Sequence, residues 1–361
     1  MILDWIAALV AICAALWTIL PLFRHDAWWI RGFEFPRVQV TVLTAAVLTV
    51  YLAIAGWRDA EDWILITVLA ACTAFQLIRI APYTSLYPKQ LRSAAAPEPR
   101  RTLAVMIANV LTPNRNAAAL MRLVRVHNPD ILLAVETDSW WESQLDGLES
   151  DYPHTVKHPL DNLYGMHLYS RLELIDPEVQ FLVEEGVPSI HTEVRLGSGH
   201  RVKLHCIHPA PPSPTENETA AERDAELLVV ANAVTETTGP VVVMGDLNDV
   251  AWSASTRLFQ KVSGLLDPRI GRGLYSTFHA GYPCLRWPLD HVFCSPDFTL
   301  VSLSRLGYIG SDHFPVLAVL HYEPGAEHEH AELEADAEDQ DRVEQKIEKV
   351  DADDEVLTRR D

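Results

Sequence analysis

The sequence has 361 residues and a formal net charge of −20. Its five cysteines form no CxxC motif and no paired spacing, which argues against a zinc site and against a disulfide framework. Residues 324–361 carry fifteen acidic and five basic residues, and their charge of −10 is half of the net charge of the chain. The rest of the chain is also acidic, so a groove for nucleic acid must be a local basic patch.

Three long apolar segments open the chain. We expect membrane-spanning helices at residues 2–23, 38–57 and 63–81, because each segment is almost free of charge and a bilayer core takes about 20 apolar residues per helix. The first segment lacks a basic start and two others follow it, which is not typical of a signal peptide. Buried helices of a soluble core are the alternative interpretation.

Basic residues near these segments indicate an orientation. With three spans, the first loop and the segment after the third span lie on the same side of the membrane. This side is rich in Lys and Arg, whereas the other side has only Arg58. The basic residues of the rich side are Arg24, Arg31, Arg37, Lys89, Arg92, Arg100 and Arg101. The positive-inside rule therefore predicts an integral protein of the cell or inner membrane whose later part lies in the cytoplasm.

Composition divides the chain into four parts. The membrane region covers residues 1–82, and the proline-rich residues 83–100 read as a linker. Residues 101–323 are sufficient for one domain with a large core. The acidic residues 324–361 contain almost no large apolar side chain, so we expect a disordered tail.

Strands and helices alternate within the domain. Helical spacing of apolar residues predicts helices at 117–127 and 222–233. Short apolar or alternating runs predict strands at 103–109, 131–135, 164–171, 190–196, 202–207, 241–244, 289–294 and 316–320.

The most informative stretch is 241–249. Its β-branched run predicts a buried strand that stops at Gly245 and delivers Asp246 and Asn248, two residues apart, to the same side. A carboxylate beside an amide is suited to holding a metal-bound water against a phosphoryl oxygen. Taken alone, the pair fits an Asx-turn at the end of a strand equally well.

Polar residues able to bind metal or phosphate also follow or precede other predicted strands. These residues are Asn109, Glu136 and His208, the pair Asp290-His291, and Asp312-His313 within Ser311–Pro315. Because sites in open α/β sheets form beyond the strand ends, side chains from different strands can converge there.

Taken in order, these motifs resemble the endonuclease/exonuclease/phosphatase superfamily, which includes exonuclease III-like, deoxyribonuclease I-like and neutral sphingomyelinase-like enzymes. The resemblance covers about residues 101–322 and rests mainly on Gly-Asp-Leu-Asn at 245–248 and Ser-Asp-His at 311–313. It implies an α/β fold, a four-layer sandwich of two packed mixed sheets flanked by helices. It also implies hydrolysis of a phosphoester with Mg²⁺ or Mn²⁺.

The resemblance further implies roles for individual residues. Glu136 would be the principal metal ligand, supported by Asn109 and Asp312. Asp246 would orient or deprotonate the attacking water, and Asn248 would hold a phosphoryl oxygen. His313, oriented by Asp290, would be a general base or a donor to the phosphate, and His208 would protonate the leaving oxygen.

Two features depart from the pattern. Exonuclease III-like members carry an acidic residue two positions after the asparagine, where this chain has Leu111, which argues against a two-metal site and against an abasic-site enzyme. The carboxylate that would orient His208 is not identified either, and Glu173, Asp176 and Glu193 are the candidates.

Three functions remain open. A phosphodiesterase acting on nucleic acid would use the basic residues between the last motifs, which equally fit a solvated face: Arg257, Lys261, Arg269, Arg272 and Arg286. A second reading has the same chemistry on a phospholipid, sphingolipid or phosphoinositide headgroup, since the spans would hold the domain against the lipid bilayer. A third is a scaffold without catalysis. Nothing in the sequence sets the oligomeric state.

Overall fold

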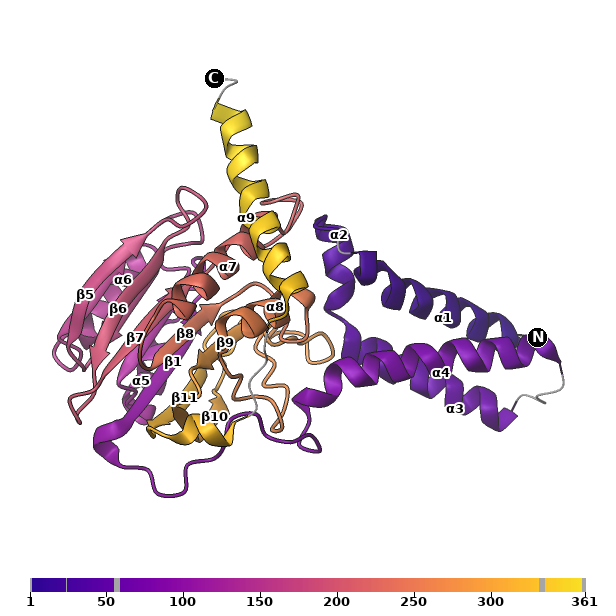
Figure 1. Ribbon diagram of the computed structural model, residues 1–361, viewed down its shortest axis with the longest axis horizontal. Helices are drawn as coiled ribbons and strands as arrows, with labels where there is room; N and C mark the ends of the chain where they lie inside the picture. The colour runs from indigo at the N-terminus through magenta and orange to yellow at the C-terminus, as the bar shows by residue number, and fades with distance from the viewer. Residues whose placement is uncertain (1, 24, 55–58, 331–334, 359–361) are drawn as a thin grey trace.

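The computed structural model describes residues 2–23, 25–54, 59–330 and 335–358. Three apolar helices, α1 (Ile2–Ile19), α3 (Arg37–Ile54) and α4 (Ala60–Ile80), pack against one another and project from one side of the remaining chain (Figure 1). With the turns that follow α1 and α4, each is long and apolar enough to cross a membrane, as predicted. Residues 55–57 of the second expected span, together with Arg24 and Arg58, lie outside the described residues.

Two mixed β-sheets form the centre of the domain. The first has the order β10-β11-β1-β2-β4-β3, with β10 (Phe298–Arg305), β11 (Val316–Tyr322), β1 (Thr102–Asn109), β2 (Ile131–Val135), β4 (Met166–Ser170) and β3 (His154–His158). The second has the order β5-β6-β7-β8-β9, with β5 (Leu174–Gln180), β6 (Ser189–Arg195), β7 (Arg201–Ile207), β8 (Val241–Asp246) and β9 (Asp290–Cys294). β1 runs parallel to β2, and β7 runs parallel to β8, while the other pairs are antiparallel.

The alternation of side chains along β1 shows how the layers arise. Val105 and Ile107 point into the core between the two sheets, whereas Met106 and Ala108 point outward to helices. This is the period-two pattern of a strand that is covered on both faces. Such burial is worth about 1.5–3 kcal/mol for each large apolar side chain.

Helices cover the outer face of each sheet. α5 (Ala117–His127) and α6 (Ser139–Leu145) pack on the first sheet, with Trp141 fully buried beneath them. α7 (Ala221–Thr235) and α8 (Ala254–Ser263) pack on the second sheet around Phe259. The predicted four-layer α/β sandwich is therefore confirmed. Short 3-10 turns complete the described elements: η1 (Leu20–Phe23), η2 (Gly32–Glu34), η3 (Ala81–Tyr83), η4 (Pro99–Arg101), η5 (Asp146–Leu148) and η6 (Ala326–Glu329).

The segment expected to be a linker packs along the sandwich. Leu91 is fully buried in the core between the sheets. Ser93 forms a β-bridge with Leu300 of β10, and the Ala94 N–H donates to the Leu300 carbonyl at 2.8 Å. A buried apolar side chain and backbone pairing with β10 together fix the path of this segment.

The expectation of a disordered acidic tail is wrong for residues 337–358, which form helix α9 (Ala337–Thr358). α9 lies along α7 and α8 (Figure 1). Val343, Ile347 and Val350 form a helical stripe that packs on these helices. Lys346 pairs with Asp224 at 2.8 Å. The stripe has only three apolar residues, so the acidic composition conceals it.

The loop between α1 and α3 docks on the domain. It contains α2 (Trp28–Arg31), and Ala27 forms a β-bridge with Thr219, just before α7. The Trp252 indole donates to the Glu34 carbonyl at 2.7 Å. The apolar helices are therefore fixed to the sandwich by a folded loop as well as by the chain that leaves α4.

Candidate active site

Several strand ends meet at one end of the sandwich and bring the predicted site residues together. β1, β2, β7 and β8 end there, β9 begins there, and the loop before β11 passes through it. The residues delivered are Asn109, Glu136, His208, Asp246, Asn248, Asp290, Asp312 and His313. Contacts or electrostatic interactions link all eight into one cluster.

The turn after β8 depends on Gly245. Its φ is +153°, and a Cβ atom at this position would lie 1.8 Å from the carbonyl oxygen of Ile207 on the neighbouring strand. Only glycine permits this approach. The Asn248 N–H then donates to Asp246 Oδ1 at 3.0 Å, so the Asx-turn considered as an alternative is present and forms part of the site.

Asn109 joins the two sheets across the site. Its amide nitrogen donates to Glu136 Oε1 at 2.7 Å and to Asp246 Oδ2 at 3.0 Å. Its amide oxygen accepts the Leu111 N–H at 3.0 Å. In this arrangement Asn109 holds two carboxylates in place, one from each sheet.

His313 lies between two carboxylates. Its Nδ1 is 2.8 Å from Asp290 Oδ2, and its Nε2 is 3.4 Å from Asp246 Oδ2. Burial alone would lower the pKa of His313, but the charges of Asp246 and Asp290 raise it to about 10. The Phe278 ring packs against the imidazole with 4.9 Å between ring centroids, which restricts its orientation.

His208 is buried and interacts electrostatically with Asp246. Burial lowers the pKa of His208 to about 4, although the charge of Asp246 acts to raise it. Tyr164 lies beside its ring, with 5.5 Å between centroids. Asn248 Nδ2 donates to the carbonyl of Pro209, the next residue, at 3.0 Å, so Asn248 and His208 are held close together.

None of the three acids suggested as partners of His208 reaches it. His208 Nδ1 is buried and has no hydrogen-bond partner in the part of the chain that the structure describes. Glu173 pairs with Arg195 at 2.6 Å, and Glu193 lies 3.4 Å from Arg201. Asp176 is exposed on β5. These acids line the far part of the second sheet, a separation that sequence order does not reveal.

Glu136 has the properties expected of a cation ligand. Its Oε2 atom is buried without a hydrogen-bond partner among the described residues. Burial, aided by Asp312 and Asp246, raises the pKa of Glu136 to about 7, although the hydrogen bond from Asn109 acts to lower it. Its φ of +60° is a costly conformation for a side chain of this kind, which is typical of functional sites. A divalent cation bound at Oε2 would neutralise the buried carboxylate and would give this oxygen the partner that it lacks among the described residues.

A second group of ligand atoms lies beside it. Asp246, Asp290 and His313 each offer one atom, and these atoms all lie within 4.8 Å of one another. Because His313 uses both ring nitrogens toward the two carboxylates, this group is already held together by the imidazole. The orphaned oxygen of Glu136 therefore favours Glu136 as the principal ligand.

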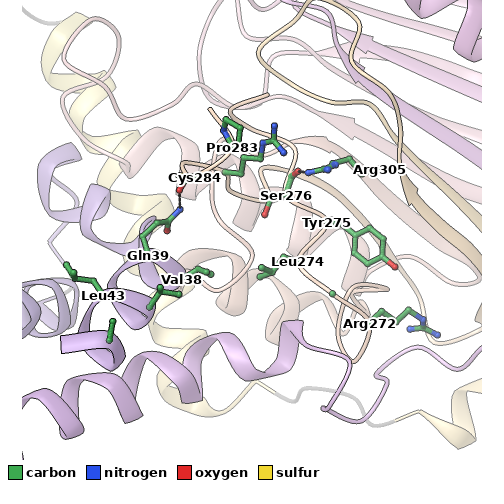
Figure 2. A pocket seen from close by; sticks show the side chains of 14 residues that line it. Val38, Gln39, Leu43, Arg272, Leu274, Tyr275, Ser276, Pro283, Cys284 and Arg305 are labelled. Atoms are coloured by element: carbon green, nitrogen blue, oxygen red, sulfur yellow. Dashed lines mark hydrogen bonds between the residues drawn. The ribbon is translucent and has the colours of Figure 1, made fainter. Parts of the chain in front are cut away.

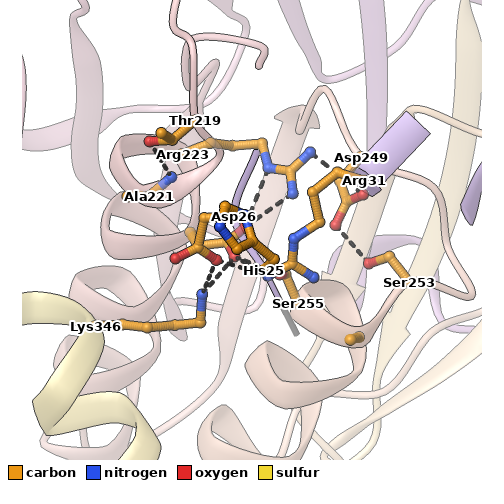
Figure 3. Close-up of polar contacts among 12 residues, drawn as sticks. His25, Asp26, Arg31, Thr219, Ala221, Arg223, Asp249, Ser253, Ser255 and Lys346 are labelled. Carbon is orange, nitrogen blue, oxygen red and sulfur yellow. Dashed lines mark hydrogen bonds and ion pairs between the residues drawn. The ribbon is translucent and has the colours of Figure 1, made fainter. Parts of the chain in front are cut away.

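Sequence reasoning missed a buried ion-pair network behind Asn248. Arg223 of α7 donates to the Asn248 carbonyl at 2.9 Å and pairs with Asp224 at 2.9 Å. Arg31, from the loop between α1 and α3, lies 3.3 Å from Asp224 (Figure 3). Two ion pairs and one hydrogen bond thus connect the loop between the apolar helices to a site residue. The charged pair Arg223-Asp224, within an otherwise apolar helical pattern, is the feature of the sequence that could have indicated this network.

The five basic residues suggested as a nucleic-acid groove do not form one surface. Arg269 is buried and pairs with Asp267 at 2.8 Å, while Lys261 pairs with Asp339 of α9 at 2.6 Å. Arg272 and Arg286 line a separate cavity next to α3. The basic residues of this region therefore lie in three separate places: a buried ion pair, a contact with α9 and the cavity next to α3.

The sequence profile of the Endonuclease/Exonuclease/phosphatase family matches residues 106–313. Among solved structures, the fold is similar to that of TDP2 of D. rerio complexed with single strand DNA product, at 16% identity and a TM-score of 0.52, over 61% of this chain and 99% of that one. It is similar to the endonuclease/exonuclease/phosphatase from Beutenbergia cavernae, at 19% identity and a TM-score of 0.50, over 62% and 72% of the two chains. The human Nocturnin catalytic domain with bound sulfate anion gives 16% identity and a TM-score of 0.50, over 63% and 100%. Comparison with proteins of curated function gave no match.

Proposed function

Because the chain belongs to the Endonuclease/Exonuclease/phosphatase family, we propose that it is a phosphodiesterase that uses a divalent cation and is anchored in a membrane by three spans. One observation carries the proposal: Asp246 touches both Asn109, at 3.0 Å, and His313, at 3.4 Å, beside the unpartnered oxygen of Glu136. This arrangement places an acceptor for a water proton next to donors for a phosphoryl group.

Hydrolysis would proceed by attack of water on phosphorus. Asp246 accepts a proton from the attacking water, whose oxygen forms the new bond to phosphorus. The bond between phosphorus and the leaving oxygen breaks, and the leaving oxygen takes a proton from His208. An anionic phosphodiester beside His208 favours its protonated form, because a nearby negative charge raises the pKa of a histidine.

The other residues would hold the phosphoryl group. The amide of Asn248 has a second hydrogen besides the one given to Pro209, and this hydrogen can be donated to a phosphoryl oxygen. His313, fixed by Asp290, would donate to the same group, because a pKa raised to about 10 keeps its imidazole protonated at neutral pH. Glu136 would hold the cation, with Asp312 and Asn109 beside it, and a bound cation would stabilise charge on the equatorial oxygens.

Nucleic acid is the first substrate class to examine. The neighbouring TDP2 structure is described with a single strand DNA product, and the shared fold makes a nucleic-acid strand a reasonable substrate here. We further expect the catalytic domain to face the cytoplasm, as the basic residues near the spans indicate.

A lipid headgroup is the second candidate because the site lies close to the spans. Val250, Ala251 and Trp252, which follow the Asp246–Asn248 turn, pack with Ile80 and Tyr83 at the end of α4. The Tyr83 hydroxyl donates to the Ala251 carbonyl. The site would therefore lie at the level of a bilayer surface.

The test uses the full chain in detergent, because residues 25–36 and 83–100 pack on the domain. The protein is offered single-stranded DNA, RNA, plasmid, mixed phospholipids and bis(p-nitrophenyl) phosphate, each with Mg²⁺ or with EDTA. Asp246→Asn is the matched control, since it removes charge with little change in volume. We expect hydrolysis of the nitrophenyl diester that requires the cation and Asp246.

The natural substrates then separate the alternatives. Release of nucleotides or nicking of plasmid supports action on nucleic acid, and release of headgroups alone supports a lipid substrate. Lack of hydrolysis with all five substrates and with either Mg²⁺ or Mn²⁺ would contradict the proposal and leave a scaffold as the better reading.

A further inference from the structure

A large cavity lies between α3 and the loop that leads into the candidate site. It has a volume of about 990 Å³. One wall is the α3 surface with Val38, Leu43 and Ala46, and the opposite wall is formed by residues 272–276, 283, 284, 286 and 305 (Figure 2). The Gln39 amide donates to the Cys284 carbonyl at 3.0 Å and ties the two walls together. None of the eight site residues lines this cavity.

The α3 wall is apolar and belongs to a candidate span. Val42 and Leu43 are 65% and 53% exposed, respectively, despite their size. They lie five and six residues into the span that begins at Arg37. With a rise of 1.5 Å per residue, the wall from Val38 to Ala46 extends about 12 Å along the helix, which is part of one leaflet of the hydrocarbon core. In a bilayer this wall faces acyl chains.

The opposite wall carries cations without counter-ions. Arg286 and Arg305 stack on the Phe314 ring, 5.0 and 4.6 Å from its centroid. Within the part of the chain that the structure describes, their hydrogen bonds go to backbone carbonyls, from Arg286 to Ala280 and from Arg305 to Ser276. Arg286 Nε is buried with no hydrogen-bond partner in the described chain.

Arg305 lies close enough to Arg286 to be affected by its charge. Burial, followed by the positive charge of Arg286, lowers the pKa of Arg305. Arg272 also bonds to carbonyls, those of Pro268 and Leu91, and no ion pair involving any of the three arginines occurs among the described residues. Arg272 and Arg286 are partly buried and Arg305 is exposed, so an anion in the cavity can reach guanidinium groups that form no ion pair with the described residues.

We propose that the cavity binds an anionic phospholipid of the bilayer, with its acyl chains along α3 and its phosphate at Arg286 and Arg305. The two walls match the two ends of such a molecule, because the apolar wall lies within a span and the cationic wall lies where the span meets the domain. A nucleic-acid strand would satisfy the arginines but would leave Val42 and Leu43 against a charged ligand, which is unfavourable. The cationic wall, with nothing paired to it, accounts for the preference for negative charge.

The test measures lipid binding and does not require catalysis. The full chain in detergent is titrated with dioleoyl phosphatidylglycerol or with dioleoyl phosphatidylcholine, and native mass spectrometry counts the bound lipids. The variant R286Q/R305Q is compared with R195Q/R201Q, which removes the same charge from exposed positions on the second sheet. We expect the first variant to bind phosphatidylglycerol about tenfold more weakly and the second to bind it within about twofold of the wild type.

Two further variants separate the charge from the shape of the cavity. Ala46→Trp fills the apolar wall without changing charge and is expected to weaken binding of both lipids. R286K/R305K keeps the charge, and it is expected to retain most of the affinity for phosphatidylglycerol, which controls for misfolding of the glutamine variant. Equal affinity for the two lipids, or unchanged binding by R286Q/R305Q, would overturn the proposal. Displacement of phosphatidylglycerol by a single-stranded oligonucleotide that binds through Arg286 and Arg305 would overturn it as well.

Discussion

His313 Nδ1 lies 2.8 Å from Asp290 Oδ2, and both side chains are buried at the point where the last strands of the two sheets approach each other. Asp290 begins β9 of the second sheet, whereas His313 precedes β11 of the first. The hydrogen bond therefore spans the sandwich and fixes which ring nitrogen faces Asp246. This contact determines the geometry of the proposed reaction.

Replacing Asp290 tests this geometry. Asp290→Asn keeps the volume but removes the charge that orients His313, so we expect kcat to fall about 10²- to 10³-fold with a small change in KM. The measurement is steady-state hydrolysis of bis(p-nitrophenyl) phosphate by the full chain. Glu323→Gln is the control, because Glu323 lies 3.8 Å from His321 at the other end of β11. Equal kcat values for Asp290→Asn and the wild type would remove His313 from the mechanism.

Metal binding at Glu136 can be measured without catalysis. Glu136→Gln replaces the orphaned carboxylate oxygen with a neutral amide, and we expect the affinity for Mn²⁺ to fall at least about tenfold. Titration followed by electron paramagnetic resonance of free Mn²⁺ gives this affinity directly. Glu178→Gln, an exposed change on β5, should have no effect. Unchanged Mn²⁺ affinity in Glu136→Gln would move the cation to the group formed by Asp246, Asp290 and His313.

The convergence of the site could be predicted because its residues stand directly at strand ends. Apolar runs mark β1, β2, β7 and β8, and parallel neighbours bring their carboxyl ends to one edge. Three strands escaped prediction. β3 is polar except for Val156, and β5 contains Pro177 and a kink at Asp176 with φ of +46°, so neither shows the usual alternation. β10 was missed as well, and an irregularity in its pairing between Leu300 and Ser302 interrupts the alternation of buried and exposed residues.

The contacts behind the site could not be predicted, because they join residues far apart in sequence. Arg31 and Asp224 are separated by 193 positions, and only the folded chain reveals that one neutralises the other. Helical spacing in a charged segment is similarly hard to recognise, which is why the stripe of Val343, Ile347 and Val350 in α9 was read as part of a disordered tail. Long-range ion pairs and sparse apolar stripes leave little trace in local composition.

Removing Arg31 tests whether the loop between the apolar helices supports the site. Arg31→Met leaves Asp224 buried with fewer cations, so we expect the free energy of unfolding to fall by about 2–4 kcal/mol. Because Arg223 holds both Asp224 and the Asn248 carbonyl, kcat should also fall, by about threefold to tenfold. Thermal unfolding and steady-state kinetics of the full chain measure the two effects.

Arg195→Met is the matched control for this change, since Arg195 pairs with Glu173 on an exposed surface. Such pairs contribute at most about 1 kcal/mol, so neither stability nor kcat should change appreciably. Loss of stability in Arg31→Met with an unaltered kcat would show that the loop is only a structural attachment.

The docking of α9 should depend on pH through Asp26, which lies between α2 and α9. Asp26 pairs with Lys346 at 3.0 Å and with Lys349 at 2.9 Å. Burial alone would raise the pKa of Asp26, but the charge of Lys346 and the hydrogen bonds from Lys349 and Arg31 lower it to about 2, below its ordinary value of 3.8. Because the docked state has the lower pKa, the stabilisation is fully present above about pH 4 and is lost as the pH falls toward about 2.

Hydrogen exchange of the α9 backbone amides, expressed relative to an unstructured peptide at the same pH, measures this docking. At pH 7 we expect Asp26→Asn to reduce protection in residues 337–350 by about tenfold, because the ion pairs are lost while the apolar stripe remains. The difference between the variant and the wild type should shrink as the pH falls through about 2 and disappear below it, where Asp26 is protonated in both the docked and the free state. Asp151→Asn, an exposed change on the far side of the sandwich, should leave the protection of α9 unaltered at every pH. Complete lack of protection in wild-type α9 at pH 7 would instead restore the disordered tail that its composition suggests.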